Sequence, residues 1–249
     1  MQLEGKVCLV TGGTKGIGAS AALELARQGA DIAINGRYDD DEAKSVMSEI
    51  EELGRKCAII VADVSLPADA KRAVEETVTK LGSVDVLVHS AGGLVAGGLF
   101  DLTEMEWMAG FDIHVHAVFH LCRAAIPHMR DRGEGSVILI SSTAGKLATP
   151  AHIAYQVVKG AIPHFTRALA REFADDNIRV NCVAPGVIRT RFHQDMPAEV
   201  KQNNLENRIP LHREGTTDQV ATMIVELVKN DYVTGDTVTI DGGLTMRIA

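Results

Sequence analysis

Tyr155 and Lys159 are the two residues whose types and spacing most directly suggest chemistry. Four positions apart on a helix, they share one face, so the ammonium group can lie near the phenol oxygen. A free tyrosine has a pKa of about 10, and a positive charge roughly 4 Å away can lower that pKa toward neutrality. The pair could therefore transfer a proton near pH 7. The same spacing is also common on helix surfaces, so the rest of the sequence must decide between the two interpretations.

A glycine-rich turn near the start of the chain suggests a second kind of site. The apolar run Lys6–Val10 predicts a buried strand, and a helical pattern follows at 17–28. Between them, Gly12 permits a tight turn, Gly16 a close approach of phosphate to the backbone, and Gly18 close helix–strand packing. Strand, glycine turn and helix start in this order predict a site for the pyrophosphate of a dinucleotide, because backbone N–H groups and the positive end of the helix meet there.

Apolar runs and helical patterns alternate along the chain. We expect strands at 6–10, 32–34, 57–62, 84–89, 136–141, 178–183 and 237–240, and helices at 17–28, 39–53, 67–81, 104–131, 153–175 and 217–229. This alternation predicts one α/β domain over residues 1–249, a Rossmann-type, doubly wound parallel sheet of about seven strands with helices on both faces. The stretch at 187–215 has little regular pattern, and we expect it to form a lid over the substrate at the carboxyl ends of the strands.

Composition narrows the class of protein. The 249 residues are 46% hydrophobic but only 4% aromatic, which suits a parallel sheet rich in Val, Ile, Leu and Ala. A net charge of −8 argues against general binding to nucleic acid or anionic membranes. We expect no membrane-spanning helix and no secretion signal. The four cysteines are scattered, without C-x-x-C spacing, and suggest reduced thiols in a cytoplasmic protein.

Ser142 supplies a third member of the site. It follows the predicted strand at 136–141 and precedes Tyr155 by thirteen positions, so a short loop can bring its hydroxyl beside the phenol. With this residue in place, the whole chain resembles the short-chain dehydrogenase/reductase family, in the branch of 3-oxoacyl-[acyl-carrier-protein] reductases and glucose dehydrogenases. The matching positions are Gly12, Thr14, Lys15, Gly16, Ile17, Gly18, Asp63, Val64, Ser90, Ala91, Gly92, Ser142, Tyr155, Lys159, Pro185, Gly186, Ile188, Thr190, 233–235 and 241–243.

The resemblance implies an NAD(P)-dependent oxidoreductase that interconverts a secondary alcohol and a ketone, or a hemiacetal and a lactone. Tyr155 would exchange the proton with the substrate oxygen, Ser142 would orient that oxygen, and Lys159 would lower the tyrosine pKa and hold the nicotinamide ribose. Asp63 would hold the adenine ring, and the segment from Pro185 to Thr190 the nicotinamide carboxamide. The resemblance also implies a homotetramer, with helices at 104–131 and 153–175 in one interface.

The sequence departs from the family pattern at His89, His114 and Val158. His114 stands where the family carries an asparagine that holds a water linking the lysine to solvent. A histidine can also donate and accept hydrogen bonds, so we include His114 among the catalytic residues and predict an active enzyme. The alternative is a catalytically impaired relative that binds the cofactor or senses it. A sugar-nucleotide epimerase is less favoured, because that class normally needs a further C-terminal substrate domain.

The expected cofactor depends on the end of the second strand. Relatives that prefer NAD(H) place an acidic residue there, whereas this chain has Gly36 followed by Arg37. A guanidinium at Arg37 and the ammonium of Lys15 suit the 2′-phosphate of NADP(H), which we favour. NAD(H) stays possible if both are ordinary surface cations.

The substrate is expected to be a small alcohol or carbonyl compound, without further definition. A basic lid would favour an anionic or polyhydroxylated molecule, unless its cations form ion pairs within the lid or with another subunit; these residues are Arg189, Arg191, His193, Arg208, His212 and Arg213. His116 and His120 have a spacing that can bind zinc, but no supporting motif accompanies them, and we expect no metal site.

Overall fold

A computed structural model describes residues 1–148, 150–191 and 196–246 of this protein. The structure is built around one parallel β-sheet. Seven strands lie in the order β3-β2-β1-β4-β5-β6-β7, and each neighbouring pair is parallel. They are β1 (Val7–Thr11), β2 (Asp31–Gly36), β3 (Cys57–Val61), β4 (Val86–His89), β5 (Gly135–Ile140), β6 (Ile178–Pro185) and β7 (Thr237–Ile240). The order reverses between β1 and β4, and ligands of such sheets bind outside the carboxyl ends of the strands at that point. The predicted fold class is confirmed.

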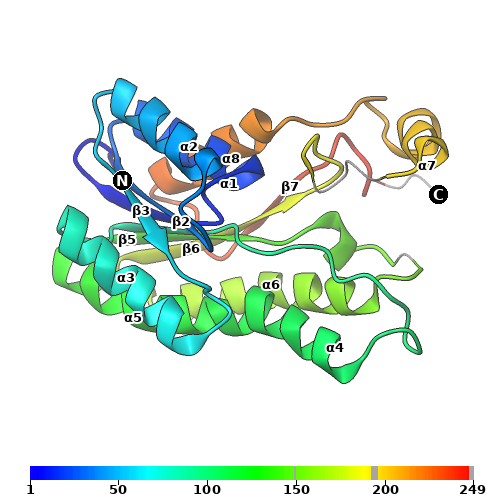
Figure 1. The fold of residues 1–249 in the computed structure, drawn as a ribbon, viewed down its shortest axis with the longest axis horizontal. Coiled ribbons are helices and arrows are strands. Elements are labelled where there is room, and N and C mark those ends of the chain that lie inside the picture. Colours follow the sequence, from blue (N-terminus) through cyan, green and yellow to red (C-terminus); the bar gives the residue numbers. More distant parts are fainter. Residues whose placement is uncertain (149, 192–195, 247–249) are drawn as a thin grey trace.

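Helices cover both faces of the sheet (Figure 1). The helices α1, α2 and α8 pack on one face, and α3, α5 and α6 on the other. Their bounds are α1 (Gly16–Arg27), α2 (Asp41–Glu52), α3 (Pro67–Leu81), α4 (Glu104–Phe111), α5 (Ala117–Arg132), α6 (Ile153–Glu172), α7 (Ala198–Asn203) and α8 (Thr217–Lys229). This arrangement explains why the strands are apolar on both sides.

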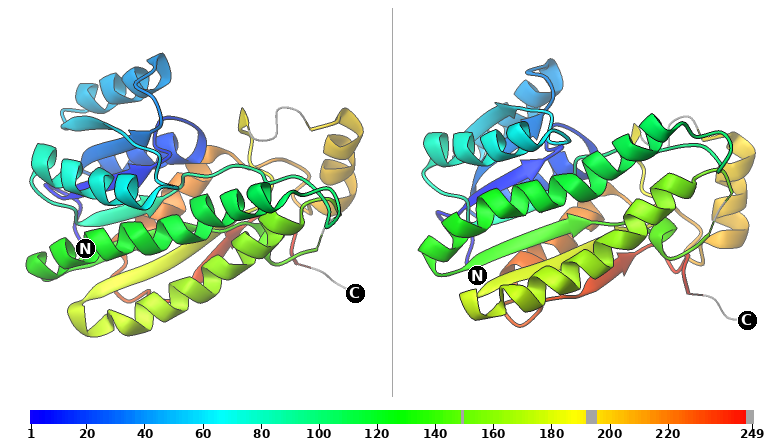
Figure 2. Two further views of the ribbon diagram at one scale, coloured as in Figure 1. Left: turned by 60° about the horizontal axis from the view of Figure 1, so that its bottom comes forward. Right: turned by 90° about the horizontal axis from the view of Figure 1, so that it is seen from below.

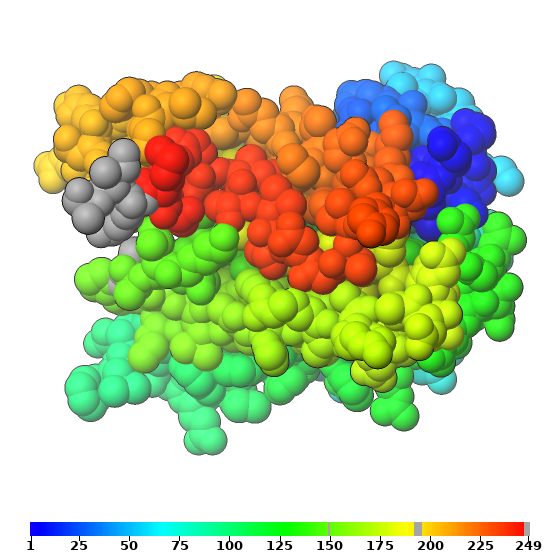
Figure 3. Space-filling view, turned by 180° about the vertical axis from the view of Figure 1, so that it is seen from behind, coloured from blue at the N-terminus to red at the C-terminus, as the bar shows by residue number. Residues whose placement is uncertain are grey.

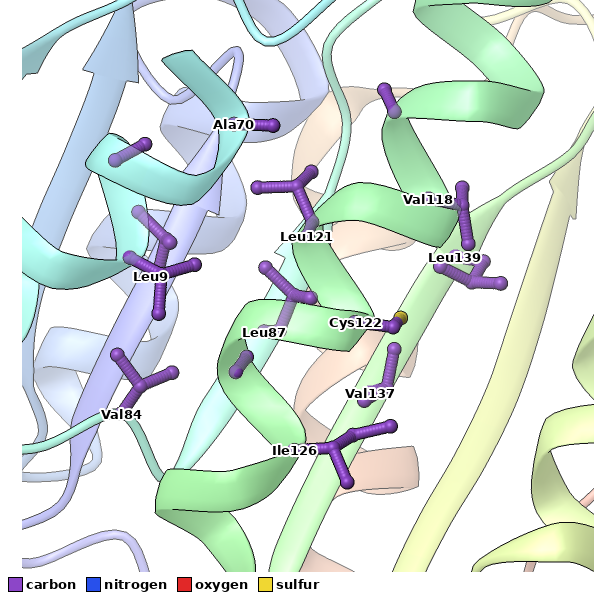
Figure 4. Close-up of a cluster of buried hydrophobic side chains, with 14 of the residues drawn as sticks. Leu9, Ala70, Val84, Leu87, Val118, Leu121, Cys122, Ile126, Val137 and Leu139 are labelled. Atoms are coloured by element: carbon purple, nitrogen blue, oxygen red, sulfur yellow. The ribbon is translucent and has the colours of Figure 1, made fainter. Parts of the chain in front are cut away.

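Along strands β1 to β6, side chains on opposite sides of the sheet enter two separate cores. On β1, Leu9 belongs to the cluster under α3 and α5, whereas Cys8 and Val10 belong to the cluster under α1 and α8. Figure 4 shows Leu121 of α5 among the side chains of the first cluster, which include Leu9 and Leu87. All four cysteines are free thiols.

Two segments differ from the sequence-based expectation. The helix predicted over 104–131 is divided by a π-helix, Asp112–His116, between α4 and α5. The stretch expected to lack regular structure contains α7 and a second π-helix, Asn204–Arg208. These helices are too short to produce a clear apolar period, which is why the sequence pattern missed them. Residues 192–195, with His193, lie outside the described residues.

Helix α4, the π-helix and α5 follow one another in one line, and α6 lies beside them (Figure 2). Seen from behind, the red C-terminal residues lie against the orange segment that leads from α7 (Figure 3). The backbone agrees, because the N–H of Leu211 donates to the carbonyl of Gly242 at 3.1 Å. Among the described helices, none has the length and apolar character needed to cross a membrane.

Replacing Leu121 with alanine tests the core. Leu121 is fully buried, so Leu121→Ala should lower the free energy of unfolding by about 2–5 kcal/mol through lost burial and a residual cavity. Urea unfolding measures the loss. Leu53→Ala, at a position 43% exposed, is the matched control and should cost much less. Equal losses in the two variants would contradict the assigned core.

Candidate active site

The carboxyl ends of four strands bring the candidate site together. Thr11 ends β1, His89 ends β4, Ile140 ends β5 and Pro185 ends β6. Because the strands are parallel, these residues lie along one edge of the sheet, and the loops that follow them carry most of the predicted site residues.

The glycine turn after β1 is packed closely against its neighbours. Gly12 has a left-handed backbone, with φ of 63°, and a Cβ there would lie 2.8 Å from the backbone of Ala91. A Cβ at Gly18 would lie 2.8 Å from the carbonyl carbon of Gly12, so a side chain would push α1 away from the turn. Lys15, the N-cap of α1, makes no side-chain capping bond, and the first turn carries no acidic residue. The positive end of α1 therefore fits an anion such as a pyrophosphate.

Residues from distant loops border this turn. A Cβ at Gly16 would lie 3.8 Å from the Cγ2 of Thr190, and one at Gly36 would lie 2.8 Å from the Cγ2 of Thr14. Ile188 is 3% exposed and forms an isolated parallel bridge with Gly215. The segment after β6 and the glycine turn thus lie side by side.

Gly186 holds that segment against β7. Its N–H donates to the carbonyl of Ile240 at 2.9 Å, and a Cβ would lie 2.7 Å from the Cβ of Asp241. Only a residue without a side chain fits this contact between the end of β6, at Pro185, and the end of β7.

The residues expected near the adenosine end of a dinucleotide differ from one another in their exposure and contacts. The guanidinium of Arg37 is exposed and lies 5.9 Å from the ring centre of Tyr38. The carboxylate of Asp63 accepts hydrogen bonds from the N–H and the hydroxyl of Ser65, at 3.1 and 2.6 Å. Val64 is buried in the core, so it supports the loop by packing. Asp63 therefore already orders its own turn.

Ser142, Tyr155 and Lys159 meet where β5 ends and α6 begins. The hydroxyl of Ser142 is hydrogen-bonded to Tyr155 and accepts the N–H of Ala144 at 3.1 Å. The ammonium of Lys159 donates to the carbonyl of Ile140 at 2.8 Å and lies 5.7 Å from the ring centre of Tyr155. The predicted trio is thus assembled around one phenol.

Burial controls the protonation of this trio. Burial raises the pKa of Tyr155, and the hydrogen bond with Ser142 opposes that rise. Burial also lowers the pKa of Lys159 to about 8. The expected lowering of the Tyr155 pKa by Lys159 is wrong for the chain by itself, because desolvation outweighs the favourable contacts. The phenol therefore keeps its proton at neutral pH.

His114 lies beside the trio. It is 2% exposed within the π-helix between α4 and α5, and its ring meets that of Tyr155 edge to face, with centres 5.8 Å apart. Its Nε2 lies 2.9 Å from the carbonyl oxygen of Gly93. Burial, with a smaller contribution from Lys159, lowers the pKa of His114 to about 2. The imidazole is therefore neutral at any physiological pH.

Ser141 and Gly145 hold α6 in place, a role that the sequence did not indicate for either residue. The hydroxyl of Ser141 donates to the carbonyl of Lys159 at 2.7 Å. A Cβ at Gly145 would lie 2.6 Å from the carbonyl carbon of Lys159, so glycine permits close packing against α6. The doublet Ser141–Ser142 carried the signal, because adjacent residues at a strand end point to opposite sides.

The cations between 187 and 215 are largely paired. Arg189 and Lys201 both pair with the buried carboxylate of Glu214, at 3.3 and 3.4 Å, and Arg191 pairs with Glu42 of α2. Of the two interpretations of this basic segment, ion pairing within the segment is confirmed for Arg189, whereas Arg191 pairs with α2 instead. No group of three or more metal-binding side chains occurs in the part of the chain that the structure describes.

Known proteins are similar to this chain in sequence. A family model described as enoyl-(acyl carrier protein) reductase matches residues 12–245. The 3-oxoacyl-[acyl-carrier-protein] reductase of Thermotoga maritima is 36% identical over 248 residues, covering 99% of this chain and 100% of the relative. The tetrahydroxynaphthalene reductase of Pyricularia oryzae is 36% identical over 259 residues, covering 98% of this chain and 91% of the relative.

A solved structure is similar over its whole length. The L-sorbose reductase of Gluconobacter frateurii, in complex with NADPH and L-sorbose, superposes with a TM-score of 0.92 at 28% identity, covering 100% of both chains. With the family match, this similarity shows that the chain belongs to the short-chain dehydrogenase/reductase family of oxidoreductases. Within that family it lies in the branch of 3-oxoacyl-[acyl-carrier-protein] reductases.

Lys159 should lower stability at neutral pH. Its pKa is about 8 in the fold against 10.5 for an unperturbed lysine, so protonation below pH 8 opposes folding and the penalty disappears as pH rises toward 10.5. Wild type should therefore gain about 2 kcal/mol of unfolding free energy relative to Lys159→Met between pH 7 and pH 10. Urea unfolding at both pH values measures this. A constant difference between the two proteins would contradict the assignment.

Proposed function

We propose that this protein is an NADP(H)-dependent oxidoreductase that interconverts a ketone and a secondary alcohol, and that it works mainly as a carbonyl reductase. The observation that carries the proposal is the buried phenol of Tyr155, hydrogen-bonded to Ser142 at the same edge of the sheet as a glycine turn that fits a pyrophosphate. A phenol that holds its proton at neutral pH is prepared to donate that proton to an oxygen that gains negative charge.

The residues have distinct roles in this mechanism. NADPH, when bound, supplies the hydride to the carbonyl carbon. Tyr155 donates its proton to the carbonyl oxygen, and Ser142 hydrogen-bonds the same oxygen and orients it. Lys159, which is partly protonated at pH 7 to 8, stabilises the phenolate that proton transfer leaves behind. His114 is neutral and hydrogen-bonded, so its contribution is to position the phenol.

The cofactor residues follow from the same arrangement. Gly12, Thr14, Lys15, Gly16, Ile17 and Gly18 would hold the pyrophosphate, Asp63, Val64, Ser90, Ala91 and Gly92 the adenosine side, and Pro185, Gly186, Ile188 and Thr190 the nicotinamide. Arg37 and Lys15 would bind the 2′-phosphate, because a guanidinium and an ammonium suit a dianion. The NADPH in the similar L-sorbose reductase supports this choice.

The proposal also covers the substrate, the assembly and the cellular location of the protein. The substrate is a small carbonyl compound that reaches Tyr155 under a lid formed by 187–215. Exposed apolar residues on α5 and α6, Phe119 and Val157, support an assembly through these helices, as in a homotetramer. We propose a cytoplasmic protein of one domain over 1–249.

Tyr155→Phe tests the reaction. Oxidation of NADPH should be followed with 3-oxoacyl esters, sugars, polyols and cyclic ketones, using wild type and the variant. We expect Tyr155→Phe to lower kcat by at least about a hundredfold, because the proton donor is lost. NADPH affinity, measured by fluorescence titration, should stay within about threefold of wild type.

Equal turnover in the two proteins would remove Tyr155 from the reaction. Binding of NADPH with no turnover of any carbonyl class would favour the alternative, a protein that binds or senses the cofactor.

Arg37→Ala tests cofactor choice. Loss of the guanidinium should lower kcat/KM for NADPH by about tenfold while leaving that for NADH nearly unchanged, since NADH has no 2′-phosphate. Lys44→Ala, on an exposed cation of α2, is the matched control and should change neither value. An equal loss with both cofactors would contradict the role of Arg37.

A further inference from the structure

Two buried histidines join the same two segments in opposite directions. His89, at the end of β4, places its Nε2 3.0 Å from the carbonyl oxygen of Ile113 in the π-helix. His114, in the π-helix, places its Nε2 2.9 Å from the carbonyl oxygen of Gly93, in the turn after β4. Each segment therefore supplies one imidazole and one carbonyl to the other.

The hydrogen-bond acceptors determine which ring nitrogens of His89 and His114 carry a proton. A carbonyl oxygen only accepts, so Nε2 of His89 and Nε2 of His114 must each carry a proton. The Nδ1 of His89 lies 2.8 Å from the hydroxyl oxygen of Thr11 and accepts a hydrogen bond from that hydroxyl. Both rings are nearly inaccessible to solvent, at 4% and 2% exposed. Two neutral, oriented imidazoles satisfy these contacts without a buried charge.

The turn at 90–93 is fixed further by packing. The hydroxyl of Thr11 accepts the N–H of Ala91 at 3.3 Å. Gly92 has φ of 142°, and a Cβ there would lie 2.6 Å from the Nδ1 of His114. The imidazole of His114 thus occupies the space that a side chain at 92 would need, and the turn can approach the π-helix only because of that glycine.

The imidazole ring of His114 also contacts the candidate active site. His114 lies edge to face against Tyr155, with ring centres 5.8 Å apart and planes at 79°. A displacement of the turn therefore moves the ring of His114, and with it the phenol. The turn carries Ser90, Ala91 and Gly92, which the proposed function assigns to the cofactor.

We propose that His89 and His114 form a reciprocal clasp that fixes the turn at 90–93 to the π-helix and so couples the cofactor-binding turn to the position of the Tyr155 ring. Both are positioning residues, and the proposal rests on the proposed function for the roles of that turn and of Tyr155. The two bonds close one loop between the segments, so losing either bond frees both segments, and losing the second has little left to free.

A double-variant cycle tests the clasp. Phenylalanine keeps an aromatic ring at each position but cannot donate, so the cycle compares wild type, His89→Phe, His114→Phe and the double variant. His114→Asn restores an N–H donor and serves as the conservative rescue. His128→Gln, on α5 away from both segments, is the matched control. Amide hydrogen exchange at 90–93 and 112–116 is measured by mass spectrometry without added ligand, followed by NADPH affinity and by kcat and KM for the best carbonyl substrate found in the screen.

The clasp predicts non-local and non-additive effects. Each phenylalanine variant should speed exchange in both segments by about tenfold, and the double variant should exceed the single ones by less than about threefold. kcat should fall by about tenfold with substrate KM nearly unchanged, and His114→Asn should recover most of the loss. His128→Gln should behave as wild type.

Several results would overturn the proposal. Faster exchange only in the segment that carries the substitution, or effects of the two substitutions that multiply, would show two independent contacts. If His89→Phe does not fold, His114→Phe alone decides, because the clasp requires faster exchange at 90–93 as well as at 112–116. The exchange measurements need no turnover, so an inactive wild type would refute the proposed function while leaving the clasp itself tested.

Discussion

The buried ammonium of Lys159 is the constraint on which the site depends. A cation that is 7% exposed must be hydrogen-bonded, and its partner is the carbonyl of Ile140 at the end of β5. The backbone of the same residue is held by Ser141, and Gly145 packs against it. One residue of α6 is therefore tied to β5 by its side chain and by its main chain. This double attachment fixes the rotation of α6, and with it the direction of Tyr155 one helical turn earlier.

The sequence was sufficient for the fold and for a candidate site. Apolar runs and helical periods predicted seven strands and their alternation with helices, because these features depend on local period. Residue spacing, together with the resemblance to the short-chain dehydrogenase/reductase family, indicated the trio of Ser142, Tyr155 and Lys159. Protonation could not be predicted in the same way. The pKa of Tyr155 depends on desolvation by the whole surrounding fold. Helical spacing reveals only one neighbouring charge, that of Lys159. Ion pairs such as Arg191 with Glu42 join residues far apart in the chain and were equally out of reach.

The π-helix at Asp112–His116 shows how one local irregularity serves a site. A continuous α-helix over 104–131 would satisfy the apolar pattern, yet the widened turn lies where the helix passes the phenol of Tyr155. Such single-turn π segments are rare and occur frequently at functional sites. In this chain the widened turn places one carbonyl and one imidazole toward the loop after β4, so a departure from regular structure is used as an attachment point.

The pairing of α1 with α8 has a consequence for synthesis of the chain. The first helix and the last helix share one core, Ser20 donates to Thr217 at 2.7 Å, and the terminal amine contacts the carbonyl of Lys229 at 2.9 Å. A nascent chain can pair β1, β2 and β3 early and cover part of α1 with them and with α2, but the part of α1 that packs on α8 has no cover until α8 has left the ribosome. Folding therefore finishes late, and the emerging chain presents an exposed apolar surface that chaperones are suited to shield.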